Sequence, residues 1–169
     1  TSTINHFTYV ILNLRNDDLI QAFSSDFQIH NTSAILENLE LKPGTEIPIA
    51  VLKHLNFKTG ATVMVCSDVP PSSGLGGSSS LTVNFVKTLS TLQKLKWNSE
   101  KIAETSFHIE RNILQHPIGK QDDYIASFGG FNFIRFTNEQ VYVEPIKINK
   151  STFDELQENL LLFFIGDTR

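Results

Sequence analysis

The sequence predicts a domain of the α+β class, and three observations support this. Segments rich in β-branched and aromatic residues open the chain and return near its end. Apolar residues at helical spacing dominate the stretch between them. The 169 residues, of which 40% are hydrophobic and 19% charged, match one ordinary globular domain. A domain of this length buries about 70% of the surface of its unfolded chain, so it folds without disulfides or a structural metal.

The first half of the chain combines strands with one short helix. Phe7–Leu14 has the composition of a strand, and Ile20–Phe23 and Asp26–His30 form a weaker pair of strands. Ile47–Phe57 carries apolar residues at intervals of four, which predicts a short helix. The mostly apolar run Ala61–Ser67 has the length of a strand.

Two longer helical patterns follow in the middle of the chain. From Leu81 onward, apolar residues recur at helical spacing. Ser99 can cap a further helix, in which the apolar residues between Ile102 and Leu114 mark one face. Pro117 predicts the end of that helix.

The last segments return to strands. Phe131–Phe136 and Gln140–Ile148 indicate two strands joined by a turn, and Thr152–Glu155 has the spacing of a capping box. Leu160–Ile165 is an apolar run that suits a final strand covered on both faces. We expect the segment that covers this strand to lie outside the chain.

Charge and cysteine usage exclude several classes of protein. The 14 Lys+Arg and 18 Asp+Glu give a net charge of −4 with no basic cluster, which argues against a nucleic-acid surface. No apolar run is long enough to span a bilayer, and the N-terminus lacks the pattern of a signal peptide. The single cysteine, Cys66, indicates a small buried residue in a reducing compartment. We therefore expect a cytoplasmic protein without a membrane or nucleic-acid partner.

The glycine- and serine-rich segment Pro70–Ser80, which we call the phosphate loop, carries the strongest chemical signal. Glycines let backbone amides turn toward a phosphate, and the predicted helix that follows adds unsatisfied amides and a partial positive charge. The loop is not a Walker A motif, because no lysine follows the glycines, and it fits a dinucleotide fingerprint poorly. The alternative is a flexible linker, although this segment joins a strand to an amphipathic helix within one domain.

Glu110 falls near the middle of the apolar face of the helix that ends at Pro117, whereas His108 falls outside that face. A buried carboxylate is costly unless it is paired or bound to a cation. Glu110 is therefore either a metal ligand or half of an internal salt bridge. We interpret His108 as a surface residue or as one that supports the site from outside.

Gly119–Tyr124 lies between the break at Pro117 and a short helical stretch. Asp122 or Asp123 can be the cap of that stretch. Alternatively, a carboxylate near a helix N-terminus and near Lys120 stays ionised and can orient, or accept a proton from, a substrate hydroxyl.

Together these segments resemble the GHMP kinases, a family of small-molecule kinases. The family motif P-x-x-x-G-L-G-S-S-A-A is matched nearly in register by Pro71–Ser80. Four further stretches look most like the D-glycero-D-manno-heptose 7-phosphate kinase branch: Ser67–Pro70, His108–Arg111, Pro117–Asp122 and Phe128–Phe133. The resemblance is firm from about Thr62 to Arg169 and looser back to Thr1.

The resemblance implies the two-layer N-terminal domain of these kinases, like domain 2 of ribosomal protein S5, over residues 1–150. Residues 151–169 would begin the ferredoxin-like C-terminal domain. The family's opening glycine-rich motif would precede Thr1 and its last glycine-rich motif would follow Arg169, so we expect the central part of a kinase. A homodimer is a further expectation.

The resemblance also implies a role for each site residue. ATP and Mg²⁺ would be the cofactors, and a sugar phosphate the partner, phosphorylated at the anomeric hydroxyl of a heptose phosphate. Asp122 would be catalytic together with Lys120, and Ser78 and Glu110 would hold Mg²⁺. ATP would contact Pro71, Ser73, Gly74, Leu75, Gly76, Gly77, Ser78, Ser79 and Ser80. The sugar would contact Gly119, Gln121, Asp123 and Tyr124.

Two departures from the family pattern leave other functions open. Gly77 stands where the family has its first serine, and Asp123 stands where a glutamine usually follows the catalytic aspartate. These changes are compatible with a catalytically inactive nucleotide-binding or regulatory module, or with a kinase of another sugar. A non-catalytic interaction domain, in which the glycine-rich loop is only structural, would not bind ATP at all.

Overall fold

A sheet of four strands forms one layer of the structure, a computed structural model that describes residues 1–163. The strands follow the order β1 (Thr8–Leu14), β4 (Ala61–Ser67), β2 (Ile20–Ser24) and β3 (Ile29–Ser33). β1 runs antiparallel to β4, with Thr8 opposite Ser67, whereas β2 runs parallel to β4, with Ile20 opposite Ala61. The sheet is therefore mixed, as the α+β class allows.

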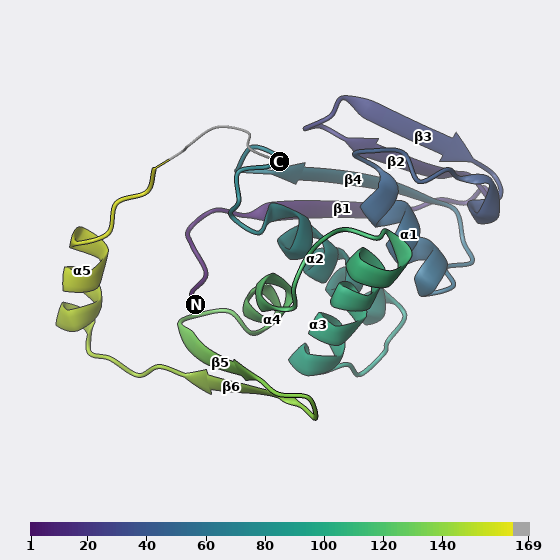
Figure 1. The fold of residues 1–169 in the computed structure, drawn as a ribbon. Helices are drawn as coiled ribbons and strands as arrows, with labels where there is room; N and C mark the ends of the chain where they lie inside the picture. The colour runs from purple at the N-terminus through teal and green to yellow at the C-terminus, as the bar shows by residue number, and fades with distance from the viewer. Residues whose placement is uncertain (164–169) are drawn as a thin grey trace.

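The helices that follow the strands form the second layer, on one face of the sheet (Figure 1). They are α1 (Glu46–His54), α2 (Gly77–Leu92), α3 (Ser99–His108) and α4 (Gln121–Phe128). A short 3₁₀ turn, η1 (Leu36–Asn38), precedes α1, and a π-helical turn, η2 (Ile109–Ile113), continues α3. α2 lies at the centre of this layer, and it contacts β1, α1, α3 and α4.

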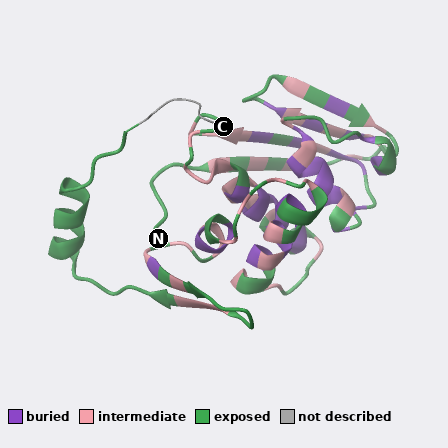
Figure 2. Ribbon diagram, in the orientation of Figure 1, coloured by how far each residue is buried: buried purple, intermediate pink, exposed green. Residues whose placement is uncertain are grey.

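The hydrophobic core fills the space between the sheet and the helices, where the buried residues gather (Figure 2). Alternation along β4 directs Val63 and Val65 toward the helices, and both are buried. Phe85 and Leu89, one turn apart on α2, are fully buried against them, together with Leu52 of α1. The same alternation explains why Cys66 is only half-buried rather than buried as the sequence predicts: it lies on the opposite face of β4.

A separate hairpin of β5 (Asn132–Phe136) and β6 (Val141–Pro145) follows α4. The start of the chain joins it, because the Thr1 amino group donates to the Asn132 carbonyl at 2.9 Å and the Asn132 amide donates back to Thr1 at 2.9 Å. Tyr124 connects the hairpin to α4 through an edge-to-face contact with Phe136, with ring centroids 5.8 Å apart.

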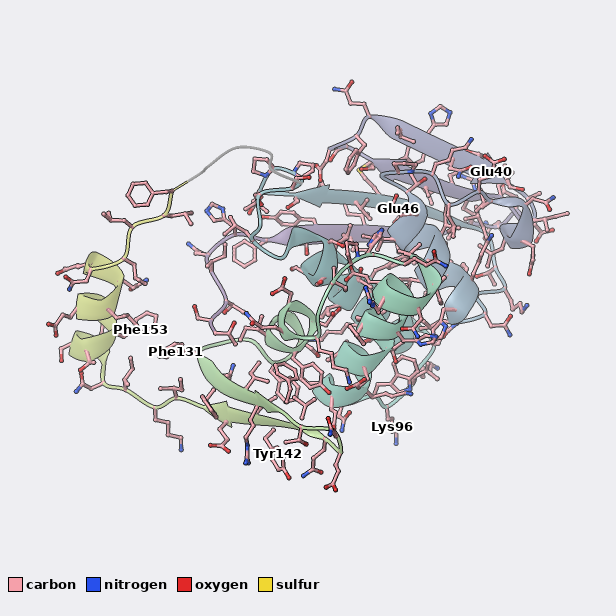
Figure 3. The ribbon with its side chains drawn as sticks, in the orientation of Figure 1. Glu40, Glu46, Lys96, Phe131, Tyr142 and Phe153 are labelled. Atoms are coloured by element: carbon pink, nitrogen blue, oxygen red, sulfur yellow. The ribbon has the colours of Figure 1, made fainter. Side chains whose placement is uncertain are left out.

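α5 (Lys150–Glu158) stands away from the rest of the structure (Figure 1), and none of its residues is buried. Its Phe153 lies apart from the side chains that pack between the sheet and the helices (Figure 3). The assignment of residues 151–169 to a second domain stays a prediction. Within residues 1–163, no helix combines the length and the apolar composition needed to cross a membrane.

Four details of the predicted elements are wrong. The strand predicted at Asp26–His30 lies at Ile29–Ser33, because residues 25–28 form the turn that joins it to β2. The residue that caps α3 is Asn98, whose side chain accepts from the Lys101 amide at 2.8 Å, rather than Ser99. α5 is likewise capped by Asn149, which accepts from the Thr152 amide, so Thr152 lies inside the helix instead of capping it. Leu160–Phe163 forms no strand and is exposed, and the rest of the predicted strand, 164–165, lies outside the described residues.

Candidate active site

The phosphate loop connects β4 to α2 and bends sharply at its glycines. Gly76 precedes the first residue of α2 with φ +70° and ψ +24°, a left-handed conformation that favours glycine. Gly74 also has a positive φ, of +75°. Because α2 begins at Gly77, the serines at 78–80 occupy its first turn. The amides of Gly77, Ser78 and Ser79 have no acceptor within the helix, whereas the Ser80 amide donates to the Gly76 carbonyl at 2.9 Å. This is the geometry of an anion-binding helix N-terminus rather than that of a linker between domains.

The three serine hydroxyls of this turn have different surroundings. Ser78 is exposed, and its Oγ donates a short hydrogen bond to Glu110 Oε2. Ser79 is buried, whereas the Oγ of Ser80 lies 3.1 Å from Thr8 Oγ1. Ser78 is therefore the hydroxyl that joins the phosphate loop to a carboxylate.

Glu110 is fully buried, as the apolar face predicts, and it belongs to the π-helical turn η2. Turns of this kind occur frequently at functional sites. The only cationic group in contact with Glu110 in the described residues is His116, whose Nδ1 lies 3.6 Å from Oε2. The other oxygen, Oε1, is buried without a hydrogen-bond partner. The salt-bridge alternative thus accounts for one carboxylate oxygen at most, and only when His116 is protonated.

Asp123 is a second buried carboxylate beside Glu110, and both of its oxygens lack a hydrogen-bond partner. Its burial, followed by the negative charges of Glu110 and Asp122, raises the pKa of Asp123 to about 9. The sequence predicts Asp123 as a sugar contact but does not predict its interaction with Glu110, because no local spacing relates a residue on η2 to one on α4.

Asp122 is exposed at the start of α4 and faces the phosphate loop. A Cβ added at Gly76 would lie 3.4 Å from Asp122 Cγ and 3.5 Å from Oδ2. The alternative role of a helix cap is wrong, because α4 begins after Lys120 with no side-chain cap, and Asp123 accepts no hydrogen bond. The predicted catalytic carboxylate and the predicted phosphate loop therefore meet.

Lys120 pairs with a residue that the sequence did not indicate. Its ammonium donates to Glu104 Oε1 at 2.9 Å and to Oε2 at 3.2 Å, and Tyr124 also donates a hydrogen bond to Glu104. Burial acts to raise the pKa of Glu104, but the hydrogen bonds from Tyr124 and Lys120 outweigh it and hold this pKa below its ordinary value. Glu104 thus holds Lys120 and Tyr124 in place, one before and one after Asp122 and Asp123 in the sequence.

The remaining predicted residues lie around this centre. Pro71, Gly119 and Gln121 are exposed, whereas Ser73, Leu75 and Gly77 are half-buried. His108 is exposed, as predicted, with its ring 5.3 Å from that of His54. Across residues 1–163, no three His, Cys, Asp or Glu side chains gather closely enough to hold a metal ion by themselves.

A loop of left-handed glycines at a helix N-terminus, with a carboxylate against it, is the arrangement expected of an α+β domain of a phosphate-binding class. Residues 46–130 match the model of the GHMP kinases N terminal domain. The chain belongs to the GHMP kinase family. The resemblance that the sequence suggested is thereby confirmed.

Relatives and solved structures agree on this family. The chain is 42% identical over 104 residues to the D-glycero-alpha-D-manno-heptose 7-phosphate kinase of Campylobacter jejuni, a match that covers 61% of this chain and 31% of that protein. It resembles the crystal structure of a D-glycero-D-manno-heptose 1-phosphate kinase from Bacteroides thetaiotaomicron with a TM-score of 0.84 and 28% identity, over 92% of this chain and 53% of the other.

A galactokinase from Lactococcus lactis complexed with galactose shares only the fold, with a TM-score of 0.70 at 16% identity, over 99% of this chain and 53% of the other. The chain spans between a quarter and about a third of the length of the curated relatives that it matches.

Proposed function

We propose that the chain binds ATP with Mg²⁺ for transfer of the γ-phosphoryl group to a sugar hydroxyl, the anomeric hydroxyl of D-glycero-D-manno-heptose 7-phosphate. The observation that carries this proposal is the contact between Asp122 and Gly76 of the phosphate loop. Phosphoryl transfer depends mainly on positioning and on neutralising charge, and this contact brings an acceptor-facing carboxylate to a phosphate-binding loop.

The phosphate loop supplies the binding of the triphosphate. The amides from Gly74 to Ser79 lie just before α2 or in its first turn, where the helix dipole favours negative charge, and Ser80 offers its hydroxyl, since its amide donates to the Gly76 carbonyl. Gly77, which departs from the family serine, has no positive φ, and a Cβ there would meet only Val69 Cγ2 at 3.7 Å. The backbone at position 77 is therefore one that the family serine could also adopt.

Ser78 and Glu110 fit a magnesium site. They contact each other at the N-terminus of α2, and Glu110 Oε1 is a buried oxygen without a partner. Mg²⁺ commonly takes one or two carboxylates together with substrate phosphates and water. When bound, the ion would neutralise charge on the phosphate oxygens during transfer.

In this proposal, Asp122 orients the acceptor hydroxyl and accepts its proton. It lies exposed in the first turn of α4, against Gly76 of the phosphate loop. Lys120 precedes it, held in place by Glu104. We assign Lys120 to the region of the acceptor, near the sugar contacts proposed for Gly119, Gln121 and Tyr124.

The choice of sugar rests on the relatives. Two of them are named for heptose phosphates, one for the 7-phosphate and the other for the 1-phosphate. The higher identity belongs to the 7-phosphate kinase, which supports the anomeric hydroxyl as acceptor. A cytoplasmic location and a homodimer stay predictions.

The test has two steps. Calorimetric titration with ATP, with and without Mg²⁺, should give binding that depends on Mg²⁺. Incubation with Mg²⁺-ATP and either heptose 7-phosphate or heptose 1-phosphate should then give ADP only with the 7-phosphate. Binding without transfer to either sugar would instead favour an inactive nucleotide-binding module. A folded chain that binds no ATP would contradict the proposal.

A further inference from the structure

Two buried carboxylates, Glu110 and Asp123, lie close enough for their charges to interact, and Glu110 contacts Ser78 of the phosphate loop. Both residues are fully buried, with a relative exposure of 0%. Three of their four carboxylate oxygens, Glu110 Oε1 and both oxygens of Asp123, have no hydrogen-bond partner. Buried carboxylates are normally paired or bound to a cation, so this arrangement needs a partner.

The protein offers no cation for Asp123 among the described residues. His116 contacts only the oxygen of Glu110 that already accepts from Ser78. Lys120, the nearest lysine in the sequence, is committed to both oxygens of Glu104. Asp122, the adjacent charge, is another acid and makes the surroundings of Asp123 more negative.

A shared proton between the two carboxylates would remove one charge. It would still satisfy at most two of the three orphaned oxygens, one as donor and one as acceptor. A divalent cation satisfies more of them at once, since it can contact oxygens of both carboxylates and neutralise both charges.

We propose that Asp123 is a direct ligand of the divalent cation, together with Glu110 and Ser78, so that this chain binds the cation before the nucleotide arrives. The proposal rests on the cation site of the proposed function and adds a second carboxylate to it. A site with one carboxylate leaves a bound Mg²⁺ with one uncompensated positive charge, which the phosphates of ATP would balance. Two carboxylates balance that charge without nucleotide.

The test measures cation binding directly, with Mn²⁺ as the probe and no nucleotide. Electron paramagnetic resonance reports free Mn²⁺ as it is titrated into the full chain. We expect saturable binding to one site in the wild type, weakened at least about tenfold in Asp123→Asn, which keeps the size of the side chain but loses its charge. Asp154→Asn, the same change on the outlying helix α5, serves as the matched control and should bind like the wild type.

Thermal unfolding is the second measurement, and it distinguishes a variant that has lost the cation site from one that binds poorly because it is misfolded. In EDTA, Asp123→Asn should unfold no lower than the wild type, since Asp123 makes no hydrogen bond or ion pair that the change would break. Addition of Mn²⁺ should raise the melting temperature of the wild type and of Asp154→Asn, but that of Asp123→Asn much less.

The outcomes separate this inference from the proposed function. Equal Mn²⁺ affinity in the wild type and Asp123→Asn, or no Mn²⁺ binding by the folded wild type, would overturn the role of Asp123 even if ATP binds with Mg²⁺. Mn²⁺ binding that depends on Asp123 in a chain that neither binds nor uses ATP would leave the cation site standing and contradict the kinase.

Discussion

The carboxylate of Asp122 lies against the backbone of Gly76, so that a Cβ at Gly76 would stand 3.4 Å from Asp122 Cγ. The two residues come from different elements, one from the turn before α2 and the other from the first turn of α4. These helices pack against each other, and their N-termini meet at this point. A phosphate held by the amides of α2 and a hydroxyl held by Asp122 would thus be neighbours.

Gly76→Ala should weaken ATP binding about tenfold while the chain stays folded. An L-residue in the left-handed conformation of Gly76 costs about 1–2 kcal/mol, and about 1.4 kcal/mol corresponds to a factor of ten in affinity. The loop would relax away from this conformation and turn its amides from the phosphate. Calorimetric titration with Mg²⁺-ATP measures the change.

Gly77→Ala is the matched control in the same loop. Gly77 has no positive φ, and its added Cβ would make only an ordinary contact with Val69. Its effect on ATP affinity should be clearly smaller than that of Gly76→Ala. Equal weakening by both variants would mean that the backbone conformation of Gly76 is not what binds phosphate.

Asp122→Asn should reduce phosphoryl transfer by about 100- to 10,000-fold, the usual contribution of a positioned general base. Because Asp122 is exposed and accepts no hydrogen bond in the described residues, the melting temperature should change little. ATP affinity should stay within a few-fold of the wild type. Steady-state kinetics separates the two effects, and transfer that survives undiminished would remove Asp122 from the mechanism.

Local patterns predicted most of the fold, because periodicity is a property of neighbours in the chain. The run Ala61–Ser67 forms β4 with the predicted bounds, and the residues with apolar spacing after Leu81 belong to α2. The helical wheel also placed Glu110 in the core correctly, even though a π-helical turn begins at Ile109. The caps were missed because asparagine caps helices as well as serine does, and Asn98 directly precedes Ser99.

The sequence predicts individual residues of the site, but not which of them contact each other. Glycines, serines and aspartates with chemical roles stand out in the sequence, whereas the pairs Lys120 with Glu104 and Asp123 with Glu110 join α4 to the helical segment before it. Such pairs depend on how two helices cross, which no spacing within either helix specifies. The sequence shows an aspartate at position 123, where the family usually has a glutamine, but it does not show that this side chain is buried.

Phe85→Ala should destabilise the chain by about 3–5 kcal/mol, the range for removal of a fully buried aromatic side chain. Phe85 fills the centre of the core between α2 and the sheet. Phe133→Ala is the matched control, because Phe133 on β5 is 55% exposed and leaves no cavity when it is truncated. Urea unfolding measures both variants, and a similar loss of stability in both would contradict the position of the core.

Glu104→Gln should remove part of the acid sensitivity of the fold. The pKa of Glu104 lies below its ordinary value of 4.5, because the hydrogen bonds from Tyr124 and Lys120 outweigh the effect of burial. A carboxyl with a lowered pKa in the folded state binds fewer protons there than in the unfolded state. Its stabilising contribution is therefore present above the ordinary pKa and is lost as the pH falls through the folded pKa.

The measurement is the urea midpoint of the wild type and Glu104→Gln between about pH 7 and pH 3. The wild type should be the more stable at neutral pH, and the difference should shrink as the pH falls below about 4.5, because glutamine does not titrate. Glu100→Gln, an exposed acid earlier on α3, controls for the general effect of removing a negative charge. A difference that stays constant over the whole range would show that Glu104 stabilises α4 by packing rather than by its charge.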